Sequence, residues 1–78
     1  MHSGMMGMNV NIDSLKNAAD FDKDFIRQMV PHHQSAVMMA QTVLKNATHP
    51  QIRHLAQAII KSQTAEIQQM QQWYQTWS

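Results

Sequence analysis

The fold is decided by the stretch Phe25-Ile26-Arg27-Gln28-Met29-Val30-Pro31-His32-His33 and its continuation to about residue 46. Apolar residues recur there every three or four positions, which is the period of an amphipathic helix. Pro31 interrupts the pattern, and a proline inside a helix removes one backbone hydrogen bond and costs about 3 kcal/mol or more. We therefore expect a long helix over about residues 20–46 that is kinked near Pro31, with two adjacent imidazoles beside the kink.

A second helical pattern follows a short break at residues 46–50. Thr48 and Gln51 are spaced as in a capping box, and the first turn of a helix tolerates Pro50. The second helix should then cover about residues 49–77. Two long helices joined by a few residues predict an antiparallel helical hairpin, which makes the protein all-α.

Composition supports this class and excludes several functions. The chain has 78 residues, two Gly, two Pro and no Cys, so it forms one small domain without disulfides or thiolate metal sites. Six Lys and Arg against five acids are scattered along it and give a net charge of +1, so no basic patch predicts nucleic acid binding. No apolar run approaches the ~20 residues needed to cross a bilayer.

Residues 1–12 differ from the rest because they hold four of the eight methionines among Gly and Ser. We expect this Met- and His-rich segment to be a mobile tail and residues 13–78 to be a single helical domain. Asp13 starts at most one short helical turn. Asp20 should cap the first long helix.

Polar residues interrupt the apolar seams of both helices. They are His32 and His33 on the first helix and Gln63 and Glu66 on the second. With 3.6 residues per turn and a hairpin that turns near residue 48, His33 should lie level with Gln63 to Ile67, and Met29 with Ile67 to Met70. The polar interruptions of the two seams therefore lie at the same level along the hairpin, with Met29 and Met70 just beside them.

This combination predicts a copper site, because neutral thioethers select Cu(I) and imidazole also suits copper. Met29 lies one helical turn from both His32 and His33, so either pair can reach one ion. The candidate ligands are Met29, His32, His33, Met70, Met38, Met39, His2, Met5, Met6 and Met8. Gln63 and Glu66 are placed to accept the second ring N–H of His33. Met38, opposite the seam, fits either a dimer contact or a surface copper site.

Other interpretations of the same residues stay open. A buried His facing a Glu is more often a satisfied polar pair, and a seam methionine usually fills a gap, so the chain can instead be a dimerisation or interaction module. A haem held by Met and His is a further alternative. The motifs of di-iron bundles and covalent haem are absent, and no nucleophile with a base is evident, so we expect no enzyme. An apolar band wider than one partner helix predicts a homodimer that forms a four-helix bundle.

The run from Asp24 to Ala40, followed by Gln63, Glu66-Ile67 and Met70 to Trp73, resembles the CopM-like family, long catalogued as a domain of unknown function. The resemblance covers about residues 20–77 and rests on Met-x-Pro-His-His and Gln-x-x-Glu-Ile-x-x-Met-x-x-Trp. It implies a ferritin-like helical bundle, exported to the periplasm, that binds Cu(I) and Ag(I) through Met and His. Storage, buffering or resistance would be its role, with other copper-handling proteins as partners. The motif residues carried over are Met29, His32, His33, Gln63, Glu66, Met70 and Trp73.

Overall fold

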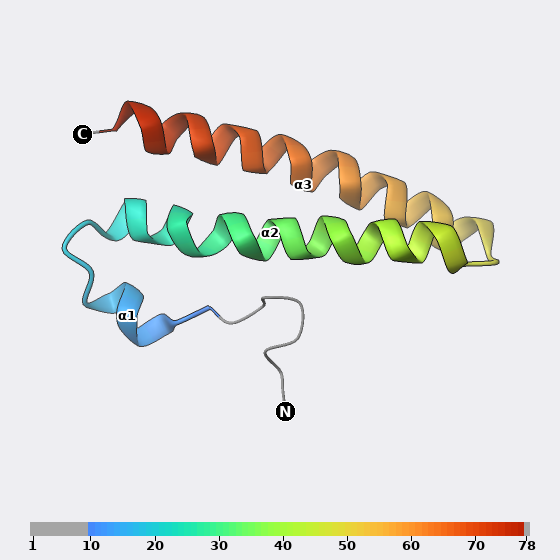
Figure 1. The fold of residues 1–78 in the computed structure, drawn as a ribbon, viewed down its shortest axis with the longest axis horizontal. Coiled ribbons are helices and arrows are strands. Elements are labelled where there is room, and N and C mark those ends of the chain that lie inside the picture. Colours follow the sequence, from blue (N-terminus) through green and yellow to red (C-terminus); the bar gives the residue numbers. More distant parts are fainter. Residues whose placement is uncertain (1–9, 78) are drawn as a thin grey trace.

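The computed structural model describes residues 10–77. This part of the chain forms three helices, α1 (Ile12–Lys16), α2 (Phe21–Asn46) and α3 (Pro50–Thr76), and no strand. The two long helices run antiparallel beside each other, and the short α1 lies next to the beginning of α2 (Figure 1). The all-α hairpin predicted from the sequence is confirmed, with α2 running through Pro31 as one helix. No described helix is long and apolar enough to cross a membrane.

The N-terminal ends of α1 and α2 are set by side-chain caps. Asp20 caps α2 as predicted, because its Oδ1 accepts a hydrogen bond of 3.2 Å from the backbone N–H of Lys23. For α1 the prediction was wrong: Asn11, not Asp13, is the cap, and it accepts from the N–H of Ser14 at 2.9 Å. Gln28 then joins α1 to α2, since its side chain accepts from the Asn11 N–H and donates to the Asn11 carbonyl.

The beginning of α3 also differs from the prediction. His49 occupies the N-cap position without a side-chain cap bond, so the capping box of Thr48 and Gln51 is not formed. Pro50 explains the shift. Its fixed φ and missing N–H suit the first helical position, which places His49 at the cap and Thr48 one residue too early to fill it.

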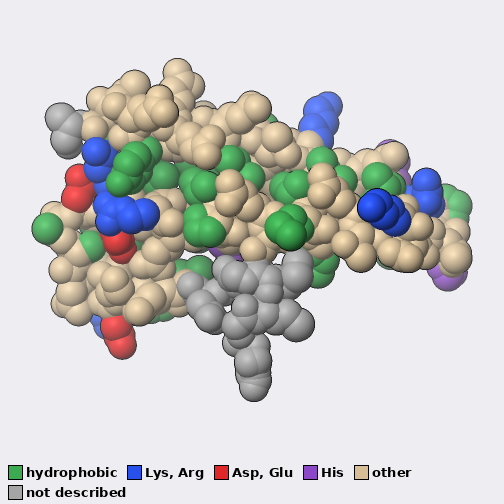
Figure 2. Space-filling view, viewed as in Figure 1, with side chains coloured by type: hydrophobic (Ala, Val, Ile, Leu, Met, Phe, Trp, Pro, Cys, Tyr) green, Lys and Arg blue, Asp and Glu red, His purple; other side chains and the backbone are tan. Residues whose placement is uncertain are grey.

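The core lies along the seam between α2 and α3. Ile26, His33 and Ala40 are buried on α2 at intervals of seven residues, and Ala56 and Met70 are buried on α3. Figure 2 shows hydrophobic side chains gathered along the line where the two helices meet. The seams predicted from the heptad spacing are therefore the ones that pack.

The fold is a single layer of helices. Its principal extents are 46 × 32 × 13 Å, and the shortest matches the ~10–12 Å diameter of one helix with its side chains. Large hydrophobic side chains consequently stay accessible, among them Leu55 at 55% and Phe25 at 44%. The four-helix bundle expected on dimerisation would add a second layer and stays a prediction.

Candidate metal centre

A hollow of about 360 Å³ between α2 and α3 brings the predicted donors together. It is lined by Phe25, Met29, His33, Glu66, Gln69, Met70 and Trp73. Each helix contributes a pair four residues apart, Met29 with His33 and Glu66 with Met70, because residues at this spacing share one side of a helix. The two thioethers, the imidazole and the carboxylate thus converge from both helices at the height that the hairpin register predicted.

His33 is held at both ring nitrogens. Its side chain is 11% exposed, Nδ1 lies 3.0 Å from the carbonyl oxygen of Met29, and Nε2 lies 2.6 Å from Oε1 of Glu66. A carbonyl oxygen only accepts, so Nδ1 carries a proton and donates to Met29. Nε2 is therefore the nitrogen available to a metal once the carboxylate moves aside. The Glu66 side chain is 55% exposed, which leaves it room to do so.

His32 contributes differently from His33. The two rings lie edge to face with centroids 6.1 Å apart, and His32 is not part of the lining of the hollow. Within the described residues, its Nδ1 is buried without a hydrogen-bond partner. A buried nitrogen without a partner is uncommon and is satisfied by a water or an ion. His32 is thus a donor beside the hollow that still needs a partner.

The other predicted site residues lie apart from this cluster. Met38 is 65% exposed, and Met39 lines a separate apolar hollow towards the hairpin turn. Gln63 is half-buried on α3 and is not part of the lining. His2, Met5, Met6 and Met8 fall outside the described residues.

Two lining residues, Phe25 and Gln69, were not among the predicted site residues. Phe25 precedes Met29 by four positions and Gln69 follows Glu66 by three, so the same helical spacing could have found them. Trp73, which the sequence assigned to the end of the hairpin and to the family motif, also forms a wall. Its ring stacks on Trp77 with centroids 5.8 Å apart. The aromatic rings on one side of the hollow therefore shield its sulfur and imidazole ligand atoms partly from water.

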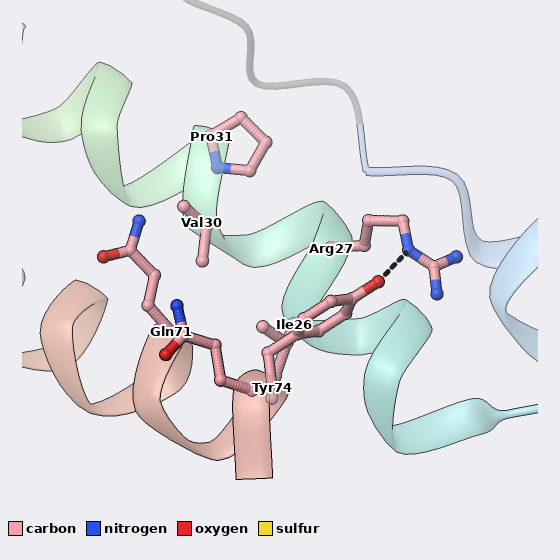
Figure 3. Close-up of a pocket in the computed structure, with 7 residues that line it drawn as sticks. Ile26, Arg27, Val30, Pro31, Gln71 and Tyr74 are labelled. Carbon is pink, nitrogen blue, oxygen red and sulfur yellow. Dashed lines mark hydrogen bonds between the residues drawn. The ribbon is translucent and has the colours of Figure 1, made fainter. Parts of the chain in front are cut away.

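A second hollow of about 500 Å³ lies along the other side of the seam (Figure 3). Arg27 Nε donates to the hydroxyl of Tyr74 at 3.3 Å, and this hydrogen bond is the main cause that raises the pKa of Arg27 above its ordinary value. The ammonium of Lys23 lies 4.8 Å from the centre of the same ring. The lining holds neither a thioether nor an imidazole. Its chemistry is a cation–π cluster rather than a site for a soft metal.

Comparison with known proteins relates this geometry to a family. A family model described as a domain of unknown function, DUF305, matches residues 1–74. Among solved structures, CopM in the Cu(II)-bound form is 51% identical with a TM-score of 0.90, covering 100% of this chain and 53% of that one. CopM in the Cu(I)-bound form is 52% identical with a TM-score of 0.85, covering 88% and 49%. CopM co-crystallised with Ag is 52% identical with a TM-score of 0.86, covering 88% and 50%.

One curated relative is an uncharacterized protein of Acanthamoeba polyphaga mimivirus. It is 39% identical over 49 residues, which are 63% of this chain and 32% of the viral protein. The chain thus spans about half the length of the solved CopM chains and about a third of the viral relative.

Proposed function

This chain belongs to the DUF305 family, and from that membership we propose that it is a copper-binding protein that takes Cu(I), or Ag(I) in its place, in the hollow between α2 and α3. One observation carries the proposal: Met29, His33 and Met70 reach the same hollow from two different helices. Support comes from CopM, which is about half identical in sequence and has been solved in Cu(I)-, Cu(II)- and Ag-bound forms.

The donor set suits a soft monovalent ion. Thioether sulfurs are neutral and polarisable and prefer Cu(I), whereas Ca²⁺ and Mg²⁺ need several oxygen ligands. Within residues 10–77, no three His, Asp or Glu side chains gather closely enough to hold a metal by themselves. We propose the sulfurs of Met29 and Met70 with Nε2 of His33 as ligands, and His32 as a further donor through its unpartnered nitrogen.

Two contacts would tune His33 as a ligand. The hydrogen bond from Nδ1 to the Met29 carbonyl fixes the ring so that Nε2 points at the hollow, and such contacts raise ligand basicity. Glu66 now holds Nε2 and would either shift to let the ion in or stay beside it as a compensating charge. Gln63 is proposed to support this outer contact from the next turn of α3.

The physiological role that fits this donor set is reversible binding. We propose storage, buffering or resistance in the periplasm, with other copper-handling proteins supplying and receiving the ion. Residues His2, Met5, Met6 and Met8 would offer additional ligands in the N-terminal segment. Met38 and Met39 stay candidates for a surface site of lower affinity.

Titration of Cu(I) against a chromogenic chelator, without oxygen and with a reductant, tests the proposal. Met29→Leu and Met70→Leu keep the apolar volume while removing a sulfur. Each should weaken Cu(I) binding by about tenfold or more, the lower range for a perturbed metal site. Met38→Leu is the matched control for the hollow, since Met38 is 65% exposed and lies outside it. This variant should keep the tight site and lose at most the weaker surface ion. Unchanged affinity in the Met29, Met70 double variant would remove the proposed site.

Deletion of residues 1–8 measures the N-terminal segment separately. If it supplies ligands, the number of bound ions should fall while the affinity of the remaining site stays the same.

The competing interaction-module interpretation makes a different prediction, namely that Cu(I) leaves the melting temperature unchanged. An ion that binds only the folded chain adds about 2.7 kcal/mol to the unfolding free energy at one hundred times its Kd.

A further inference from the structure

One face of the α2–α3 layer is lined mostly by apolar side chains, and we call it the apolar face. His33, Glu66 and Gln69 interrupt it at the copper hollow. On α2 its residues recur in steps of three, four and seven, and on α3 in steps of three, four and fourteen, so each set shares one side of its helix. The residues are Phe25, Met29, Ala36, Met39 and Val43 on α2 and Ile52, Leu55, Ile59 and Trp73 on α3. The face holds the copper hollow and, towards the hairpin turn, an apolar groove of about 250 Å³.

Exposure of hydrophobic side chains is concentrated on this face. Nine large hydrophobic residues of the described chain are at least 40% exposed. Seven of them line these two hollows or a third hollow of the same face, about 520 Å³ in volume, which lies where Leu15 of α1 approaches the open end of the hairpin. The seven are Phe21, Phe25, Met39, Ile52, Leu55, Trp73 and Trp77. Soluble monomers rarely expose a contiguous apolar surface of this extent, and such surfaces mark interaction sites.

Charge separates this face from the opposite one, which we call the basic face. None of the residues lining the three hollows of the apolar face is Lys or Arg. They include two carboxylates: Glu66, which is paired with His33, and Asp22, which is exposed at the end of the hairpin and can stay at the rim of an interface. On the basic face, the guanidinium of Arg27 lies beside Tyr74 (Figure 3), and the ammonium of Lys23 lies over the same ring. Figure 2 shows Lys and Arg side chains towards both ends of the hairpin and one further basic side chain along α3. Burying an unpaired charge is costly, so the apolar face is the one that can be covered.

The size of the face fits a second hairpin. Helices of 26 and 27 residues are each about 40 Å long, and packed helices lie about 8–10 Å apart. A face of about 40 × 20 Å has an area of about 800 Å², which is what each partner buries in a standard protein interface. Domains also need two packed layers, and this hairpin supplies one. A second copy therefore matches the face in length, area and chemistry.

We propose that two copies of this chain pack through their apolar faces as an isologous four-helix bundle and enclose both copper hollows. With the hairpins antiparallel, the aromatic end of one copy lies over the apolar groove of the other. Met29 is about 7 Å from the middle of α2, so both hollows come to lie near the centre of the bundle. Each hollow, open to solvent in one hairpin, is closed by the other copy.

Sedimentation of the full chain without metal tests the interface. The wild type should be a dimer, and Leu55→Glu should weaken association by about 100-fold or more because it buries an unpaired carboxylate in the apolar groove. Two controls add the same charge elsewhere: Met38→Glu, outside the face, and Gln71→Glu, on the basic face. Both should remain dimers. A wild type that is still monomeric at about 0.1 mM, which would mean a Kd weaker than that value, would overturn the proposal. A dimeric Leu55→Glu or a monomeric Gln71→Glu would overturn it as well.

A second measurement covers the case in which Leu55→Glu fails to fold. The chain has no Cys, so Leu55→Cys and Met38→Cys each introduce a single thiol. Maleimide labelling of Cys at position 55 should slow as protein concentration rises, while labelling at position 38 should not. Equal rates at all concentrations would overturn the proposal. Because neither readout uses metal, a monomer that still binds Cu(I) contradicts only this interface and leaves the copper proposal standing.

Discussion

His33→Leu should separate metal binding from stability. His33 is 9% exposed as a residue and makes its two ring contacts with Met29 and Glu66. A charge-assisted hydrogen bond contributes about 1.5–3 kcal/mol when shielded from water. The Glu66 side chain is more than half exposed, so solvent screens the pair and reduces its contribution to about 1 kcal/mol or less.

The substitution replaces this polar contact with apolar burial. Burying a leucine side chain stabilises by about 1.5–3 kcal/mol relative to exposing it, and part of that gain is already present for the imidazole body. In a single hairpin, the released Glu66 carboxylate can rotate towards solvent, so it is not left as a buried charge. We therefore expect the unfolding free energy to stay within about 1 kcal/mol of the wild type, which is a shift in Tm of less than about 4–8 °C for a domain of this size.

Metal binding should respond far more strongly than stability. Among residues 10–77, His33 is the only histidine that lines the hollow. Its loss should weaken Ag(I) or Cu(I) binding about 100-fold, the upper range for a perturbed metal site. The assay is thermal unfolding followed by circular dichroism at increasing Ag(I), with His54→Leu as the matched control on an exposed histidine. A variant that keeps the full Ag(I)-induced rise in Tm would refute the assignment of His33 as a ligand. A loss of more than about 3 kcal/mol without metal would show instead that the pair is a core element.

Three further predictions concern the scaffold. Ala56 is 2% exposed at the contact between the helices, so Ala56→Leu should lower the unfolding free energy in urea by about 1–3 kcal/mol because the seam has no room for the larger side chain. Ala58→Leu, at an exposed position, should change the unfolding free energy little. Equal effects of the two substitutions would contradict close packing at Ala56. Asp20→Ala should remove the α2 cap and lower the unfolding free energy by about 1 kcal/mol. An unchanged Tm would show that the cap does not stabilise the fold. Pro31→Ala should stabilise by about 2 kcal/mol because it restores a helical N–H, and lower stability in the same urea assay would mean that the ring itself packs.

The sequence sufficed for the helices because their determinants are local. Apolar spacing places Met29 and His33 on one side of α2, and Asp20 caps the helix through a contact three residues away. The cap positions of α1 and α3 were missed for an equally local reason. Asn11 competed with Asp13, and Pro50 moved the beginning of α3.

The height at which the two helices meet was also predictable, since a short turn leaves little freedom in the register of a hairpin. The sequence could therefore place Glu66 opposite His33. It could not tell which ring nitrogen each partner would take, because the orientation of the ring depends on the space left by α3.

The sequence by itself determined a pair of amphipathic helices that carry soft donors at matching heights. Only the tertiary structure decided that Phe25 and Gln69 complete the hollow of Met29, His33 and Met70, whereas Met39 lines a separate apolar hollow. The tertiary structure also decided that the apolar face of the helical layer is left uncovered in a single hairpin. Periodicity depends on neighbours a turn away along the chain, whereas a hollow and an uncovered face depend on how the side chains of two helices fill the space between them.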